Sequence, residues 1–150
     1  MVIYEIFWIY NDFENILREG FMKEYCWYMI FLWKKGLLFK EAIFGDPELV
    51  YIGKAVKQAV SDRLLRGHDQ LIMCLRDFDQ KIVMGVGKSE NPSTLSEEEI
   101  GNIESALIAK FKPRLNAHGL KEYKGPRIII RSRSNLLGEC QDIFNWEWSS

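Results

Sequence analysis

The stretch Tyr25–Trp33 contains nine consecutive residues without a charge. It is too short to cross a bilayer as a helix, which needs about 20 residues. An apolar run of this length indicates a strand that is buried on both faces. Successive side chains of a strand point to opposite faces, so Cys26 and Tyr28 should share one face and Trp27 should lie on the other. The chain must therefore cover both faces of a sheet.

A second predicted strand is followed at once by a helix. Leu49–Ile52 is rich in β-branched and aromatic residues, and Gly53 ends it. The helix that follows has an apolar stripe formed by Val56, Ala59, Val60 and Leu64. Arg63 falls inside that stripe, and Gly67 is a helix stop. A tyrosine at a strand end, a glycine and an inward arginine make a poor core but a good phosphate site.

A third strand is predicted at Lys81–Gly87, and the clearest helix start comes after it. Ser96 with Glu99 three residues later forms the pattern of a capping box. Glu104 then lies within the apolar stripe of this helix. A carboxylate on a buried face is costly unless it is paired or bound to a metal. The sequence leaves both explanations open, an ion pair with Arg63 or a divalent-metal site.

The positive charges gather in the later part of the chain. The net charge is −1, so the chain as a whole is not a polycation. Between Ser105 and Arg133 a single acid, Glu122, stands against eight basic residues: Lys110, Lys112, Arg114, Lys121, Lys124, Arg127, Arg131 and Arg133. Such a segment indicates either a solvated surface or an electrostatic footprint for a phosphate backbone.

The cysteines favour a reducing compartment. Cys26, Cys74 and Cys140 are odd in number and include no CxxC pair, so neither a disulfide framework nor a structural zinc site is indicated. The apolar N-terminus carries Glu5 and lacks a basic start, unlike a signal peptide. The expected location is the cytoplasm, without a membrane span.

Several motifs in order resemble the GIY-YIG nuclease family. Tyr51-Ile52-Gly53, a helical arginine and then His68 is similar to the second half of the family pattern. Cys26-Trp27-Tyr28 stands where the first triplet would be and keeps its last residue. Lys112–Asn116 is similar to the Pro-x-x-Asn ending, so the resemblance runs from Tyr25 to Asn116.

The resemblance implies an α/β (α+β) fold, a small three-stranded antiparallel sheet flanked by helices, with N-terminal and C-terminal additions. Residues 1–24 would be an extension packed on a nuclease domain of residues 25–150. The implied activity is metal-dependent hydrolysis of DNA phosphodiester bonds.

The resemblance also implies catalytic roles for Tyr28, Tyr51, Arg63, His68, Glu104 and Asn116. Glu104 would hold one divalent ion per site, Mg²⁺ or Mn²⁺, while Arg63 would bind the scissile phosphate. Arg66 is the alternative arginine. The general base is open between a tyrosine and His68, because a free tyrosine has a pKa of about 10 and needs a nearby cation. Asn116 would brace the site, although from the residues alone it could equally be a turn residue.

DNA contacts are expected from Gly53, Lys54, Arg66, Lys112, Arg114, Arg127, Arg131 and Arg133. A predicted edge strand at Arg127–Arg131 would place Arg127, Arg131 and Arg133 on one face. DNA is the expected partner, and the nuclease could act as a homodimer or with a partner protein. The alternative is a catalytically weakened fold that binds DNA or protein, because Cys26-Trp27 replaces the smaller residues of the family triplet.

Overall fold

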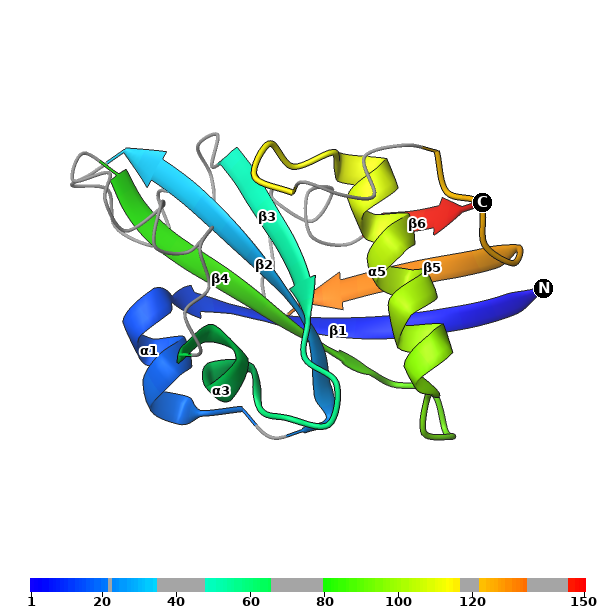
Figure 1. Cartoon of the computed structure of the whole chain (residues 1–150), viewed down its shortest axis with the longest axis horizontal. Helices are drawn as coiled ribbons and strands as arrows, with labels where there is room; N and C mark the ends of the chain where they lie inside the picture. Colours follow the sequence, from blue (N-terminus) through cyan, green and yellow to red (C-terminus); the bar gives the residue numbers. More distant parts are fainter. Residues whose placement is uncertain (22, 35–47, 66–79, 117–121, 135–145) are drawn as a thin grey trace.

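The computed structural model describes residues 1–21, 23–34, 48–65, 80–116, 122–134 and 146–150, which form six strands and three helices (Figure 1). The strands are β1 (Val2–Asp12), β2 (Tyr25–Lys34), β3 (Glu48–Lys54), β4 (Gln80–Ser89), β5 (Ile128–Ser134) and β6 (Trp146–Ser149). The helices are α1 (Phe13–Glu19), α3 (Val60–Leu65) and α5 (Glu97–Phe111).

All six strands belong to one mixed sheet that curls into a half-barrel (Figure 1). Its order is β3-β2-β4-β1-β5-β6. The prediction of a three-stranded antiparallel sheet is therefore wrong. The three expected strands are present as the antiparallel neighbours β3, β2 and β4. However, β1 continues the sheet antiparallel to β4, and β5 continues it parallel to β1.

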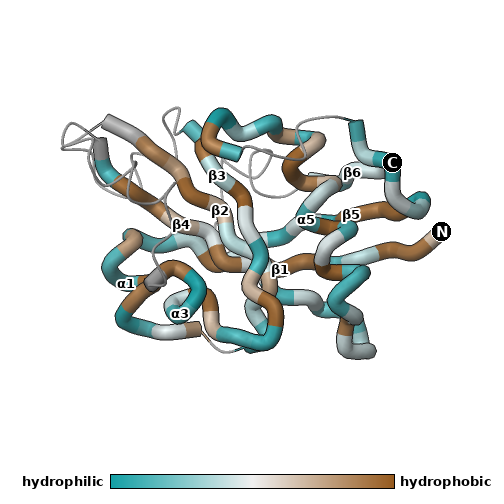
Figure 2. The backbone as a smooth tube through the Cα atoms, in the orientation of Figure 1, coloured by the Kyte–Doolittle hydropathy of each residue, from teal (hydrophilic) through white to brown (hydrophobic). Residues whose placement is uncertain are grey.

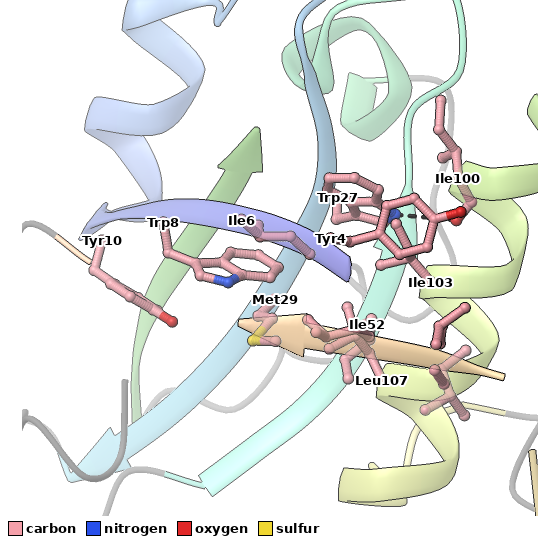
Figure 3. Close-up of a cluster of buried hydrophobic side chains, with 14 of the residues drawn as sticks. Tyr4, Ile6, Trp8, Tyr10, Trp27, Met29, Ile52, Ile100, Ile103 and Leu107 are labelled. Atoms are coloured by element: carbon pink, nitrogen blue, oxygen red, sulfur yellow. Dashed lines mark hydrogen bonds between the residues drawn. The ribbon is translucent and has the colours of Figure 1, made fainter. Parts of the chain in front are cut away.

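The first part of the chain contributes a central strand because its side chains alternate. Along β1 the buried side chains are Tyr4, Ile6, Trp8 and Tyr10. They point to the same side of the strand (Figure 3). Residues between them, such as Phe7 and Ile9, are half-buried on the other face. A strand that is apolar on both faces suits the interior of a sheet, and β1 lies between β4 and β5.

Each face of the sheet carries its own core. α5 packs on one face, where its apolar residues meet β1 and β2, and the indole Nε1 of Trp27 donates a hydrogen bond of 3.1 Å to the carbonyl of Ile100 (Figure 3). Residues of α1 and α3 form the second core on the opposite face, including Ile16, Val60 and Leu64. The most apolar stretches of the chain follow the sheet strands (Figure 2).

The alternation predicted for β2 is confirmed from Trp27 to Leu32 but is wrong for Cys26. Trp27 and Tyr28 belong to opposite cores as expected. The pairing with β4 shifts register between Tyr25 and Trp27. An extra residue at such a bulge turns the side chains that precede it, so Cys26 packs on the same core as Trp27.

The predicted capping box of α5 is confirmed. The backbone N–H of Glu99 donates to the hydroxyl of Ser96, and the backbone N–H of Ser96 donates to the carboxylate of Glu99, both over 3.1 Å. At the other end Lys112 adopts the left-handed conformation, with φ of 47°, and its N–H caps the carbonyl of Ile108 over 2.7 Å. Pro113 then prevents the helix from continuing.

A strand is present at the predicted position near Arg127–Arg131, but the prediction that it lies at the edge of the sheet is wrong. β5 begins at Ile128 and pairs on both sides, with β1 and with β6. The alternation on which the prediction depended does hold, since Ile128 and Ile130 are buried while Arg131 is exposed. Among the described residues, no helix has the length and apolar character needed to cross a membrane.

Candidate active site

The two tyrosines of the motif meet on one face of the sheet, near its β3 edge. Tyr28 of β2 pairs with Gly53 of β3, and Ile30 pairs with Tyr51. Tyr28 and Tyr51 are therefore diagonal neighbours on adjacent strands, and their ring centroids lie 6.0 Å apart. Antiparallel pairing of the two motif strands thus brings both phenols together, as the resemblance implies.

Gly53 is required here by close approach rather than by its backbone conformation. A Cβ atom at this position would lie 2.3 Å from the ring carbon Cζ of Tyr28 and 2.4 Å from its hydroxyl oxygen. The phenol of Tyr28 therefore lies directly over the backbone of Gly53. Any larger residue would push the ring away from Tyr51.

Both phenols hold their protons more tightly than a free tyrosine. Burial raises the pKa of Tyr28, which is fully buried, and raises the pKa of Tyr51, which is half-buried. Arg63 opposes the shift at both rings by favouring the phenolate. The hydrogen bond between the two phenols raises the pKa of Tyr28 and lowers that of Tyr51.

Arg63 lies on α3, which packs in the same core as Tyr28. Its backbone N–H donates to the carbonyl of Ala59 over 3.1 Å at the start of this short helix, and its side chain is half-buried. Its charge acts on Tyr28, Tyr51 and Glu104. In the described part of the chain Arg63 forms no salt bridge, so its guanidinium can still take the bidentate contact that suits a phosphate.

Glu104 lies on the side of α5 that faces the end of β3. Its side chain is 21% exposed, so it sits at the border of the buried stripe in which it was expected. Burial raises the pKa of its carboxyl group, while Lys54 and Arg63 lower it. Lys54, rather than Arg63, is its ion-pair partner, with 3.8 Å between Nζ and Oε1.

The approach of Lys54 to α5 depends on a small residue of the helix. A Cβ atom at Gly101 would lie 3.3 Å from the Nζ atom of Lys54. The ammonium group therefore lies over the helix surface one turn before Glu104. This pair was not predicted from the sequence, where Lys54 was assigned to DNA contacts and to the support of a tyrosine base. A glycine three residues before the carboxylate is the signal that could have indicated it.

The donors around Glu104 suit only a metal ion that keeps water and substrate oxygens as ligands. The part of the chain that the structure describes contains no group of three or more His, Cys, Asp or Glu side chains placed to hold a metal. Glu104 would thus supply one carboxylate to the ion. Mg²⁺ tolerates such a site because it dehydrates reluctantly and accepts phosphate oxygens, and Mn²⁺ is bound by the same oxygen ligands.

Asn116 holds the outer edge of β3. Its Oδ1 atom accepts a hydrogen bond of 3.0 Å from the N–H of Ile52, and its Nδ2 atom donates one of 2.9 Å to the carbonyl of Ile52. The N–H of Leu115 donates to the carbonyl of Val50 over 3.0 Å. Asn116 and Leu115 thus take the place of a neighbouring strand beside Tyr51 and Gly53.

The predicted DNA-binding residues divide into four groups. Lys54 and Gly53 lie at the tyrosines, whereas Arg66 and the catalytic candidate His68 lie outside the described residues. Three arginines are engaged by carboxylates: Arg114 by Glu48, Arg131 by Glu147 and Glu5, and Arg133 by Glu90. Lys112 and Arg127 are exposed without such partners among the described residues. The arginines of β5 are separated from β2 by two strands, so they are not part of the tyrosine site.

A pocket of about 570 Å³ lies beyond the end of β3. Cys26, Val56 and Leu95 form its apolar wall, and the ion pair between Lys57 and Glu97, 2.9 Å long, lies at its rim. Sequence reasoning missed this pocket because the bulge in β2 turns Cys26 to this side. The tyrosines lie outside it, on the other face of β2.

The chain matches no family model, no curated protein and no solved structure.

Proposed function

We propose that this chain is a divalent-metal-dependent endonuclease that hydrolyses phosphodiester bonds of DNA. The observation that carries the proposal is the convergence of two phenols, a guanidinium and a half-buried carboxylate at the β3 edge. Tyr28, Tyr51, Arg63 and Glu104 come from four different elements, yet their charges act on one another. Perturbed titratable groups that cluster in this way favour a functional site.

Each residue then has a task that its surroundings support. Arg63 binds the scissile phosphate and offsets the charge that develops on it. Tyr51 is half-buried and can reach a substrate, so it positions the attacking water, while the buried Tyr28 orients Tyr51 through their hydrogen bond. Asn116 keeps Tyr51 and Gly53 in register from the edge of the strand.

Glu104 is the residue that would hold Mg²⁺ or Mn²⁺. When bound, the ion would supply Lewis-acid stabilisation of the phosphate and of the leaving oxygen. Both tyrosines have raised pKa values, which makes either a weak base near neutral pH without help from a cation. The general base therefore stays open between Tyr51 and His68. The odd number of cysteines, without a CxxC pair, favours the cytoplasm as the setting.

A second candidate function is a DNA- or protein-binding module without catalysis. Two observations favour it: Tyr28 is fully buried, and Lys54 already neutralises the proposed metal ligand Glu104. The first experiment must therefore separate catalysis from binding.

The test is nicking of supercoiled plasmid with Mg²⁺, comparing the wild type with Glu104→Ala, each also in EDTA. Glu98→Ala is the matched control, because it removes an exposed carboxylate from the same helix. The proposal expects nicking by the wild type and by Glu98→Ala that is lost with EDTA and with Glu104→Ala.

Nicking that persists in Glu104→Ala would exclude this metal site. If the folded wild type cuts neither plasmid nor a large DNA of mixed sequence, while it still binds DNA, the binding module is the better account. Circular dichroism of every variant checks that the chain remains folded.

A further inference from the structure

A second pocket, of about 490 Å³, lies between the end of α5 and β6 and shares no residue with the candidate active site. Figure 1 shows β6 beside this helix. The lining of the pocket includes two lysines, one acid, two aromatic rings and a serine: Lys110, Lys112, Glu122, Tyr123, Trp148 and Ser150. We refer to this pocket as the α5–β6 groove.

Aromatic rings form one wall of the groove. Tyr123 and Trp148 are half-buried and meet edge to face, with centroids 5.7 Å apart. The hydroxyl of Tyr123 donates to the carbonyl of Pro126 over 2.9 Å, which fixes the ring. Beside them, the ammonium of Lys110 lies 4.9 Å from the ring centroid of Trp146. These rings are held by packing and by hydrogen bonds, so they can offer aromatic surface without further ordering.

The cations that carboxylates leave unpaired are found at this groove. Within the basic segment, Arg114, Arg131 and Arg133 are engaged by acids. Lys110 and Lys112 line the groove and form no salt bridge with any described carboxylate. Among the described residues of the segment this also holds for Lys124 and Arg127, which follow Tyr123 by one and four residues. Among the lining side chains, two lysines stand against one acid, Glu122.

We infer that the α5–β6 groove binds an unpaired strand of nucleic acid. Lys110 and Lys112 would contact its phosphates, and the rings of Tyr123 and Trp148 would stack on its bases. Aromatic rings interleaved with cations are the usual means of binding single strands. In a duplex the faces of the bases are already stacked on one another, so the rings of this wall select an unpaired strand.

The inference deepens the proposed function and rests on it in one respect, the identity of the strand. If the chain cleaves DNA, the substrate class is DNA that carries a single-stranded flank next to the cleaved duplex. The groove would hold that flank while the tyrosine site holds the scissile phosphate. Binding itself does not depend on cleavage, so the two can be tested apart.

The first measurement is fluorescence anisotropy of a labelled oligothymidylate in EDTA, with a blunt duplex of equal length for comparison. The groove variant is Lys110→Ala with Lys112→Ala. The matched control is Arg18→Ala with Lys23→Ala, which removes the same charge from exposed positions of α1 and the segment after it. The wild type should bind the single strand more tightly than the duplex.

Salt dependence distinguishes phosphate contacts from a general loss of charge. Each phosphate contact to a single strand contributes about 0.7 to the slope of log K against log salt. The groove variant should therefore lose about 1.4 of that slope, two contacts at about 0.7 each, whereas the control keeps the wild-type slope. An equal loss in both variants would mean diffuse attraction and would overturn the inference.

Stacking is tested with Trp148→Ala, which should weaken single-strand binding by about 5-fold or more, while Trp148→Phe keeps most of the affinity. Urea unfolding shows whether β6 survives, and the lysine variants do not depend on it. Equal affinity for duplex and single strand, or displacement of the oligonucleotide by an equal concentration of poly-glutamate, would overturn the assignment.

The outcomes separate the two proposals. If the chain binds the single strand through the groove but nicks no DNA, the groove assignment stands and the endonuclease proposal is wrong. If the wild type nicks plasmid and the lysine and Trp148 variants bind the single strand as tightly as the wild type, the endonuclease proposal stands and the assignment of the groove is wrong.

Discussion

The side-chain amide of Asn116 makes two hydrogen bonds to the backbone of Ile52, accepting from its N–H over 3.0 Å and donating to its carbonyl over 2.9 Å. Ile52 stands between Tyr51 and Gly53 on the outermost strand of this side of the sheet. Backbone groups buried at an edge need partners, and a side-chain amide has both a donor and an acceptor. Asn116 is itself 7% exposed, so water could not readily replace it.

We expect Asn116→Ala to destabilise the protein by about 1–3 kcal/mol, because it leaves the N–H and the carbonyl of Ile52 buried without partners. Urea unfolding measures this loss. Asn102→Ala is the control, since Asn102 is a partly exposed amide of α5 and such a change should stay within about 0.5 kcal/mol. Equal losses in the two variants would show that the contact to Ile52 contributes nothing.

Gly53→Ala should also destabilise the protein, by about 1–3 kcal/mol, since its Cβ would overlap the ring of Tyr28 and force the ring to move. Gly101→Ala is the matched control. There the Cβ meets only the flexible end of Lys54, at 3.3 Å, and alanine favours the helix by about 1 kcal/mol. We therefore expect urea unfolding to show opposite signs for the two changes.

Nicking activity should also differ between the two variants. Gly53→Ala should lose far more activity than its unfolded fraction explains, whereas Gly101→Ala should not. If Gly53→Ala is as stable and as active as the wild type, Tyr28 does not need its place over the β3 backbone.

Glu104→Gln should make the protein more stable at neutral pH. Burial raises the pKa of the Glu104 carboxyl group in the folded state, so the folded chain binds more protons than the unfolded chain between the two pKa values. The contribution of this protonated carboxyl group to the free energy of unfolding is therefore complete below the unfolded pKa, about 4.3. It is lost as the pH rises through the folded pKa. The increase in the free energy of unfolding that Glu104→Gln produces should therefore become larger as the pH rises through the folded pKa.

Urea midpoints measured from pH 4 to pH 8 check this dependence, with Glu98→Gln as the exposed control on the same helix. The same growth in both variants would contradict a buried origin. Added Mg²⁺ should stabilise the wild type and not Glu104→Gln, because a ligand of the folded state raises stability only where its site exists.

Local signals predicted the elements better than their arrangement. The capping box of Ser96 and Glu99 lies within four residues, and it was predicted correctly because no distant contact decides it. The partners of β1 are different: residues 83–89 and 128–134 lie far along the chain. Residues 1–24 were predicted only as an extension packed on the domain. The alternation of Tyr4, Ile6 and Trp8 is typical of a strand, but it contains nothing that specifies which strands lie beside it.

The candidate site shows the same division. Tyr28, Tyr51, Arg63 and Glu104 were predicted from motifs and their order. The structure places Tyr28 beside Tyr51, and the charges of Arg63 and Glu104 act on both rings. Whether a cation is already paired depends on the register of distant strands. Arg131 meets Glu147 because β5 and β6 pair at those residues. For that reason the basic segment could not be divided from sequence into paired arginines and the unpaired lysines of the α5–β6 groove.

The central place of β1 also has a consequence for biosynthesis. β1 is apolar on both faces and leaves the ribosome before the strands that flank it, which are completed only when Ser89 and then Ser134 have been made. Until then its aromatic side chains have no sheet to enter. Pairings between distant segments close slowly and leave chains prone to aggregation. The nascent chain should therefore need a chaperone that shields β1 until β4 and β5 have been synthesised.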